Sequence, residues 1–222
     1  MKFEQVRTDI LASCLVLAER GYLAGTGGNV ATRADQEHFA VTPSGIDYYA
    51  MTPADICILR LSDKTQVEGE SPASVEAGMH AAVFKARPDC GTSIHTHQPI
   101  ASAYTLLAKP LCVEDRDQRL ILGKTVPCVG YAPSGTGLLA WRVGRAFGPA
   151  VHAALMRNHG VVCVGTDAGE AMTRVATLES ACAAFFLAHT TAARSPLDES
   201  VRQLVADTLG SVLNSETHEV SL

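Results

Sequence analysis

Apolar residues recur at helical spacing near the start of the chain. Val6, Ile10, Cys14 and Leu17 are three or four residues apart and predict an amphipathic helix that ends near Gly21. Short β-branched runs and longer helical patterns then alternate. The expected strands are residues 38–42, 56–61, 92–97, 126–129 and 160–164. The expected helices are residues 72–86, 100–107, 138–147, 168–190 and, with a weaker pattern, 197–213.

This alternation predicts a layered α/β fold, because no linker, repeat or low-complexity tract interrupts it. The helix over residues 72–86 is expected to be capped by Ser71, with Pro72 in its first turn. Residues 1–222 are expected to form one domain, since a single core can grow to roughly 250 residues. The tail after about Leu213 is expected to fray.

Composition narrows the class of partner. The chain is 47% hydrophobic and has a net charge of -5 without a run of Lys or Arg. Nucleic acid and anionic membranes would each need a positive patch, so the expected partner is a small molecule or a protein. The N-terminus has no basic leader, and no apolar run approaches the roughly 18 residues of a membrane span. No membrane association is therefore expected.

The seven cysteines are scattered and never form a Cys-x-x-Cys pair. This excludes a zinc ribbon, a redox dithiol and a secreted disulfide framework. Cys57 and Cys163 stand in apolar runs, where a free cysteine acts as a small hydrophobic residue. We therefore expect a reducing cytoplasm.

Three histidines stand at strand boundaries. His95 and His97 end a predicted strand, and its period of two places both rings on one face. Alone, the pair is more often two ordinary surface histidines. His159 supplies a third ring just before the strand that begins at Gly160. Three imidazoles with an open position are typical of a catalytic zinc site.

Glu76 precedes the histidine strand and lies in the first turns of the expected helix. Beside a metal, its carboxylate could be a resting ligand and then a general acid/base. The alternative is an ordinary surface glutamate near a helix N-terminus, spaced i,i+4 from His80.

Two turn-rich segments could bind an anion through backbone N–H groups. The run from Gly25 to Val30 lacks the third glycine of a dinucleotide motif and follows a helix, which excludes that interpretation. The second segment runs from Thr42 to Gly45. Plain tight turns are the alternative for both.

Taken in order, these motifs resemble the class II aldolase/adducin family over residues 5–190. The motifs are Gly25-Thr26-Gly27-Gly28-Asn29-Val30, Thr42-Pro43-Ser44-Gly45-Ile46, Pro72-x-Ser74-x-Glu76, Arg87-Pro88-Asp89, His95-Thr96-His97, Tyr131-Ala132-Pro133-Ser134-Gly135-Thr136 and Asn158-His159-Gly160.

The resemblance implies a three-layer α/β/α sandwich with a mixed or mostly antiparallel sheet. It also implies a cytoplasmic homotetramer with sites at the subunit interfaces. One Zn²⁺ per subunit, or another divalent ion, would be bound by His95, His97 and His159. The residues implied for binding an anionic substrate are Thr26, Gly28, Asn29, Ser44, Gly45 and Ser74.

The implied activity is a zinc-dependent lyase that cleaves a C–C bond in a small hydroxy-ketone through a metal-stabilised enediolate. Glu76 would move the proton, and Glu instead of Asp favours an aldolase over a sugar-phosphate 4-epimerase. A decarboxylase of a 3-oxo acid is a further alternative. A non-catalytic adducin-like interaction domain is another, but such domains generally lack the three histidines.

Two departures from the family pattern leave the substrate open. Val75 stands where phosphosugar members have a second serine, so the anion could be phosphate or carboxylate. Fuculose-type enzymes also use tyrosines as proton donors, whereas residues 113–117 contain none and no tyrosine follows Tyr131. The second proton donor is therefore unassigned.

Overall fold

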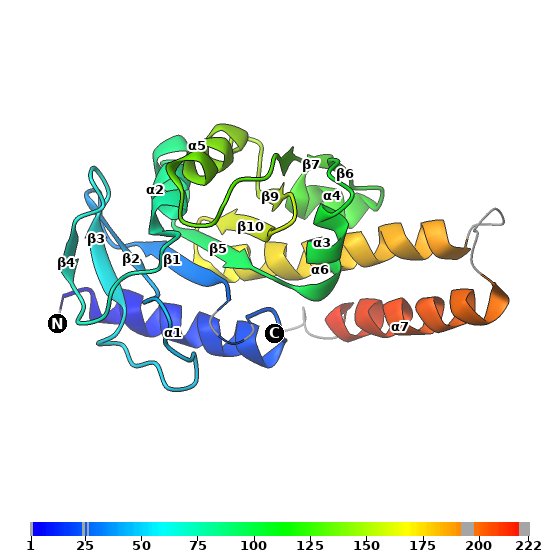
Figure 1. Cartoon of the computed structure of the whole chain (residues 1–222), viewed down its shortest axis with the longest axis horizontal. Coiled ribbons are helices and arrows are strands. Elements are labelled where there is room, and N and C mark those ends of the chain that lie inside the picture. The colour runs from blue at the N-terminus through cyan, green and yellow to red at the C-terminus, as the bar shows by residue number, and fades with distance from the viewer. Residues whose placement is uncertain (1, 24, 26, 192–197, 218–222) are drawn as a thin grey trace.

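A twisted sheet runs through the centre of the computed structural model, which describes residues 2–23, 25, 27–191 and 198–217 (Figure 1). Its eight strands lie in the order β4-β3-β2-β1-β5-β10-β9-β8, antiparallel except for the β8–β9 pair. The strands are β1 (Asn29–Arg33), β2 (His38–Val41), β3 (Cys57–Arg60), β4 (Gln66–Glu68), β5 (Thr92–Thr96), β8 (Cys128–Val129), β9 (Ala153–Met156) and β10 (Gly160–Gly165). Strands β6 (Leu111–Cys112) and β7 (Thr125–Val126) form a separate pair.

Helices cover both faces of the sheet. One face packs on α1 (Glu4–Glu19), α3 (Pro99–Thr105) and α6 (Ala168–Thr191), and the other on α2 (Ala77–Ala86) and α5 (Gly137–Ala146) (Figure 1). Strand β10 needs both layers because its apolar side chains alternate between the two faces of the sheet. Val161 and Cys163 pack in the core with α1, α3 and α6, whereas Val162 and Val164 pack in the core with α2 and α5. Helices α4 (Arg116–Leu122) and α7 (Glu199–Thr217) both pack against α6. The predicted three-layer α/β/α sandwich with a mixed sheet is confirmed.

Helix α6 is long and apolar enough, by length and composition alone, to cross a membrane, which the sequence analysis did not expect. It is nevertheless a core helix of the sandwich, because Val175, Leu178 and Cys182 are fully buried against the sheet. Its buried Glu179 accepts hydrogen bonds from two backbone N–H groups at the start of α3. All seven cysteines are free, as predicted.

The helix predicted over residues 72–86 begins only at Ala77, so the expected Ser71 cap is wrong. The preceding segment pairs with the turn after β2 instead. Ser44 N donates to Pro72 O at 2.8 Å, and Ser74 N donates to Thr42 O at 3.0 Å. These long-range bonds outweigh the local signal for a helix.

Other differences follow from turn and capping chemistry. Pro127 lacks an N–H and divides the strand predicted at 126–129 into β7 and β8. Helix α4 was not predicted, although Asp115 caps it by accepting hydrogen bonds from the N–H groups of residues 117 and 118. The last helix, predicted at 197–213, runs from 199 to 217. Residues 197 and 218–222, including the end of the expected frayed tail, lie outside the described residues. The strands that were not predicted are β1, β4, β6 and β9.

Candidate active site

The three predicted histidines lie together where β5 ends beside the start of β10. The two strands are antiparallel, with Thr96 opposite Val161, so the chain just before β10 lies against the end of β5. His95 and His97 come from this end of β5, and His159 comes from the turn between β9 and β10. Their ligand nitrogens all lie within 4.8 Å of one another. This cluster can hold a metal ion.

The backbone hydrogen bond of His95 places Nδ1 away from the cluster and Nε2 toward it. Nδ1 donates to the carbonyl oxygen of Val161 at 2.8 Å, so in the neutral ring Nε2 carries a lone pair. This Nε2 lies 3.0 Å from Nε2 of His97 and 3.2 Å from Oε2 of Glu76. A cation at this point, or a second proton on the ring, would relieve the repulsion between the lone pairs. The residues present therefore fit a bound metal ion.

Glu76 is 5% exposed and both of its carboxylate oxygens are engaged. Oε2 accepts a hydrogen bond from Asn29 Nδ2 at 2.9 Å, and Oε1 accepts one from Ser134 Oγ at 2.8 Å. Oε1 also lies 3.2 Å from Nε2 of His159. Burial raises the pKa of Glu76, but hydrogen bonds from His159, from His95 when its ring carries a second proton, and from Asn29 outweigh it and hold that pKa well below its ordinary value. The carboxylate is therefore ionised.

Behind Glu76, a row of buried hydrogen bonds leads into the sandwich. Asn29 Oδ1 lies 2.5 Å from Nε2 of His80, and Nδ1 of His80 lies 2.8 Å from Oγ of Ser93. From the sequence, His80 was expected only as a neighbour of Glu76 on one helix face, and no separate role was predicted for Ser134 or Ser93. The signal for His80 in the sequence was its place one helical turn after Glu76, on a helix that is mostly apolar.

The two expected anion-binding loops meet where Thr42 N donates to Val30 O at 3.1 Å, and the loop at residues 42–45 also lies against the segment that carries Ser74. The backbone bonds described above bring Ser44 and Ser74 together, and Gly45 adopts a φ of 75°. Ser74 Oγ accepts the N–H of Glu76 at 3.2 Å. Val75, in place of a second serine, is 65% exposed.

Gly28 lies in the other loop with a φ of 85°, and an added Cβ would lie 2.8 Å from the carbonyl oxygen of His95. Tyr48, which the sequence analysis did not select, donates its buried hydroxyl to the carbonyl of Gly28 at 2.6 Å. It thereby holds the loop against the histidine strand. The side chain of Asn29, which was also expected to bind the anion from this loop, is hydrogen-bonded to Glu76 and His80 instead. Thr26 lies outside the described residues.

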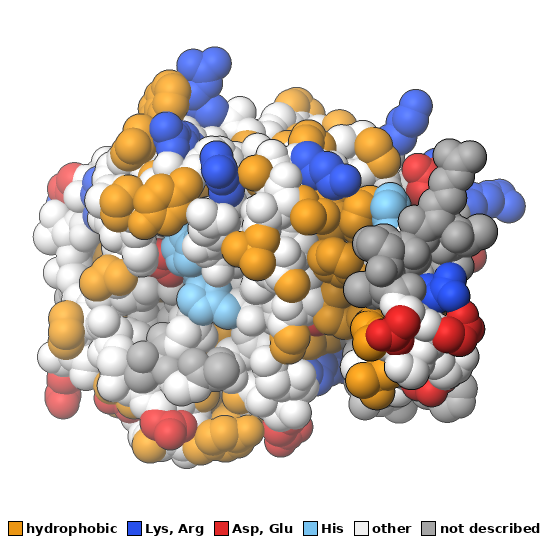
Figure 2. All heavy atoms as spheres, turned by 45° about the vertical axis from the view of Figure 1, so that its right-hand side comes forward, with side chains coloured by type: hydrophobic (Ala, Val, Ile, Leu, Met, Phe, Trp, Pro, Cys, Tyr) orange, Lys and Arg blue, Asp and Glu red, His pale blue; other side chains and the backbone are white. Residues whose placement is uncertain are grey.

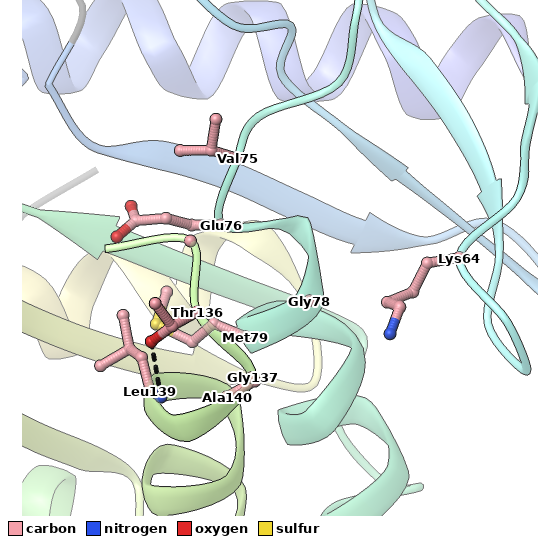
Figure 3. A pocket seen from close by; sticks show the side chains of 10 residues that line it. Lys64, Val75, Glu76, Gly78, Met79, Thr136, Gly137, Leu139 and Ala140 are labelled. Atoms are coloured by element: carbon pink, nitrogen blue, oxygen red, sulfur yellow. Dashed lines mark hydrogen bonds between the residues drawn. The ribbon is translucent and has the colours of Figure 1, made fainter. Parts of the chain in front are cut away.

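A pocket of about 200 Å³ opens beside Glu76, between the first turns of α2 and α5. Figure 3 shows Glu76 at the start of α2, Thr136 capping α5 through Leu139 N, and Lys64 across from both. His97 is exposed and His159 is partly exposed, and Figure 2 shows histidine side chains at the surface of the face that it draws. The site is therefore open to a small molecule.

The fold and this site together define the class. Residues 8–186 match the family described as Class II Aldolase and Adducin N-terminal domain. The chain belongs to this family, and it is an aldolase-type enzyme.

Its relatives narrow the class. The chain is 30% identical over 172 residues to an L-fuculose phosphate aldolase of Methanococcus maripaludis, a match that covers 78% of this chain and 91% of the relative. It is 31% identical over 182 residues to a 5-deoxy-D-ribulose 1-phosphate aldolase of Bacillus thuringiensis serovar kurstaki, covering 81% and 83%. A solved L-fuculose 1-phosphate aldolase structure superposes with a TM-score of 0.80 and 28% identity, covering 93% of this chain and 96% of that one.

Proposed function

We propose that the chain is a zinc-dependent aldolase that cleaves a C–C bond of a small anionic hydroxy-ketone by retro-aldol chemistry. The observation that carries this proposal is the convergence of His95, His97 and His159 on one point beside an ionised Glu76. Three imidazoles with a carboxylate are a usual composition for catalytic zinc, although another divalent ion could take the same place.

The three histidines would hold the metal, and the backbone hydrogen bond of His95 prepares one of them for this. His95 donates Nδ1–H to Val161, which orients the ring and leaves Nε2 free. When bound, the ion supplies Lewis-acid stabilisation of the negative charge that develops on the substrate oxygens. None of the seven cysteines belongs to the cluster, so the histidines would hold the ion without a sulfur ligand.

Glu76 would carry the proton at the carbon next to the substrate carbonyl. Its two oxygens face the histidine cluster, and its backbone is fixed at the start of α2. General acid/base catalysis needs a group held within hydrogen-bond reach of that carbon, and Asn29 and Ser134 hold this carboxylate from both sides.

The anionic end of the substrate would bind the paired loops. Gly28, Ser44, Gly45 and Ser74 offer backbone N–H and hydroxyl groups, and Thr26 would extend the same loop. The relatives are named for sugar phosphates, which favours a phosphorylated sugar. Asn29 could bind the anion through its side chain only by leaving Glu76.

A homotetramer with sites at its interfaces fits the exposed surface near the site. Three large hydrophobic side chains are exposed on the segment around Ser134, whose hydroxyl contacts Glu76. They are Tyr131, Leu138 and Trp141. A second chain covering this segment would bury them and adjoin the site.

The test is a screen of small phosphorylated and carboxylated ketoses for cleavage and for decarboxylation, with and without a chelator. We expect cleavage that the chelator abolishes and zinc restores. Glu76→Gln should lower kcat by roughly 10²- to 10⁴-fold with zinc still bound. Glu37→Gln, a change at an exposed residue of the hairpin between β1 and β2, is the control. Full activity of Glu76→Gln, or cleavage that survives metal removal, would contradict the proposal.

A further inference from the structure

The hydrogen bonds behind Glu76 form one continuous row of four side chains. The row runs from Ser93 through His80 and Asn29 to the carboxylate, with separations of 2.8, 2.5 and 2.9 Å. Each of the four residues is at least 95% buried. They come from the separate elements β5, α2 and β1 and from the N-cap of α2.

The contact at the Glu76 end of this row determines which atom donates in each of the other hydrogen bonds. Asn29 donates from Nδ2 to Oε2 of Glu76, so its amide oxygen, Oδ1, faces Nε2 of His80. His80 must then donate Nε2–H to that oxygen, and its Nδ1 accepts the hydroxyl proton of Ser93. Burial lowers the pKa of His80 to about 3, which agrees with a neutral ring. One tautomer of His80 therefore fixes one orientation of the Asn29 amide.

Without His80, Oδ1 of Asn29 loses its partner, and the amide is held only by the carboxylate that it positions. The Asn29 side chain can then turn away from Oε2. Glu76 would lose its amide donor, and the hydroxyl of Ser134, which belongs to an exposed segment, would remain beside the two histidine contacts. A catalytic group misplaced by 1 Å can cost about 10²-fold in rate.

We propose that His80 is a positioning residue for Glu76 and that it acts through Asn29. The inference rests on the proposed proton transfer by Glu76. It gives Asn29 a role in holding the carboxylate, in place of the substrate contact expected from the sequence.

Two variants at one position separate positioning from packing. His80→Leu fills the space without a donor, whereas His80→Gln offers an amide N–H to Asn29 and an oxygen to Ser93. We expect His80→Leu to lower kcat by about 10- to 100-fold with KM changed less than about 2-fold. His80→Gln should recover most of that loss. Equal losses in both variants, or none in His80→Leu, would overturn the proposal.

A second measurement does not depend on activity. NMR of metal-free protein labelled with ¹⁵N-histidine reports which ring nitrogen of His80 carries the proton, and the side-chain amide signal of Asn29 reports its contacts. We expect the proton on Nε2, and an Asn29 signal that moves in His80→Leu but not in His80→Gln. A proton on Nδ1, or an unmoved signal in His80→Leu, overturns the positioning role. Inactivity of the wild type toward every ketose, with the NMR result as expected, contradicts the proposed function instead.

Discussion

Glu76 owes its properties to residues that are remote in the chain. The donor to its Oε2 is 47 residues away, and the donor to its Oε1 is 58 residues away. Both bonds stabilise the anion, as do the contacts with His95 and His159 when these rings carry a second proton. At the scale of single residues, a buried charge is therefore tolerated because it is paired on both oxygens.

His80 leads to a prediction about stability in acid. Its pKa is about 3 in the folded chain and near 6.5 in the unfolded chain. Between these values only the unfolded chain binds the proton, so stability falls as the pH drops from about 6.5 toward 3. Lowering the pH from 7 to 5 should cost the wild type about 2 kcal/mol through this residue. Urea unfolding of metal-free protein at both pH values should show a smaller loss in His80→Gln.

The exposed His189 provides the matched control for this prediction. His189→Gln should lose stability in acid as the wild type does. Equal acid sensitivity of His80→Gln and the wild type would show that His80 is protonated in the folded chain.

The turn between β9 and β10 is the element that presents the third histidine. His159 N donates to Met156 O at 3.1 Å, and Asn158 adopts a φ of 54°, which asparagine tolerates better than most residues. Gly160 follows at the start of β10, directly against the end of β5. The turn therefore sets the distance between His159 and the other two histidines.

Gly160→Ala tests this close approach. An added Cβ would lie 2.5 Å from Thr96 O and 2.7 Å from Cδ2 of His97, so β5 and β10 would have to separate. We expect a loss of about 1–3 kcal/mol in stability and weaker zinc binding. Gly148→Ala, with no atom near its added Cβ, is the control. Thermal unfolding and competition with a zinc chelator measure both effects, and unchanged zinc affinity in Gly160→Ala would contradict the expectation.

At the scale of the whole molecule, the site lies at the edge of the two cores, where β5 ends and β10 begins. Helices α2 and α5 cover one face beside it, and the exposed residues Tyr131, Leu138 and Trp141 lie near by in the chain. A second copy of the chain that buried these side chains would form another wall beside the site.

The proposed homotetramer gives a direct prediction. Light scattering should find a mass four times the 23.4 kDa of one chain. Trp141→Glu should shift the population to smaller species, because it places a charge among the apolar side chains that the interface would bury. Leu204→Glu, at a similarly exposed position on α7, is the comparison. A monomeric wild type at micromolar concentration would contradict the homotetramer.

The sequence by itself determined the layered fold class, the family and the three histidines that the structure brings together. These depend on local periodicity and on ordered motifs, and the alternation of β10 between two cores follows directly from its apolar run. Only the tertiary structure decided the start of α2, the assignment of Asn29 to Glu76 and the contacts of His80. These rest on hydrogen bonds between residues about 30 to 50 positions apart, and in a buried site such bonds outweigh local propensity.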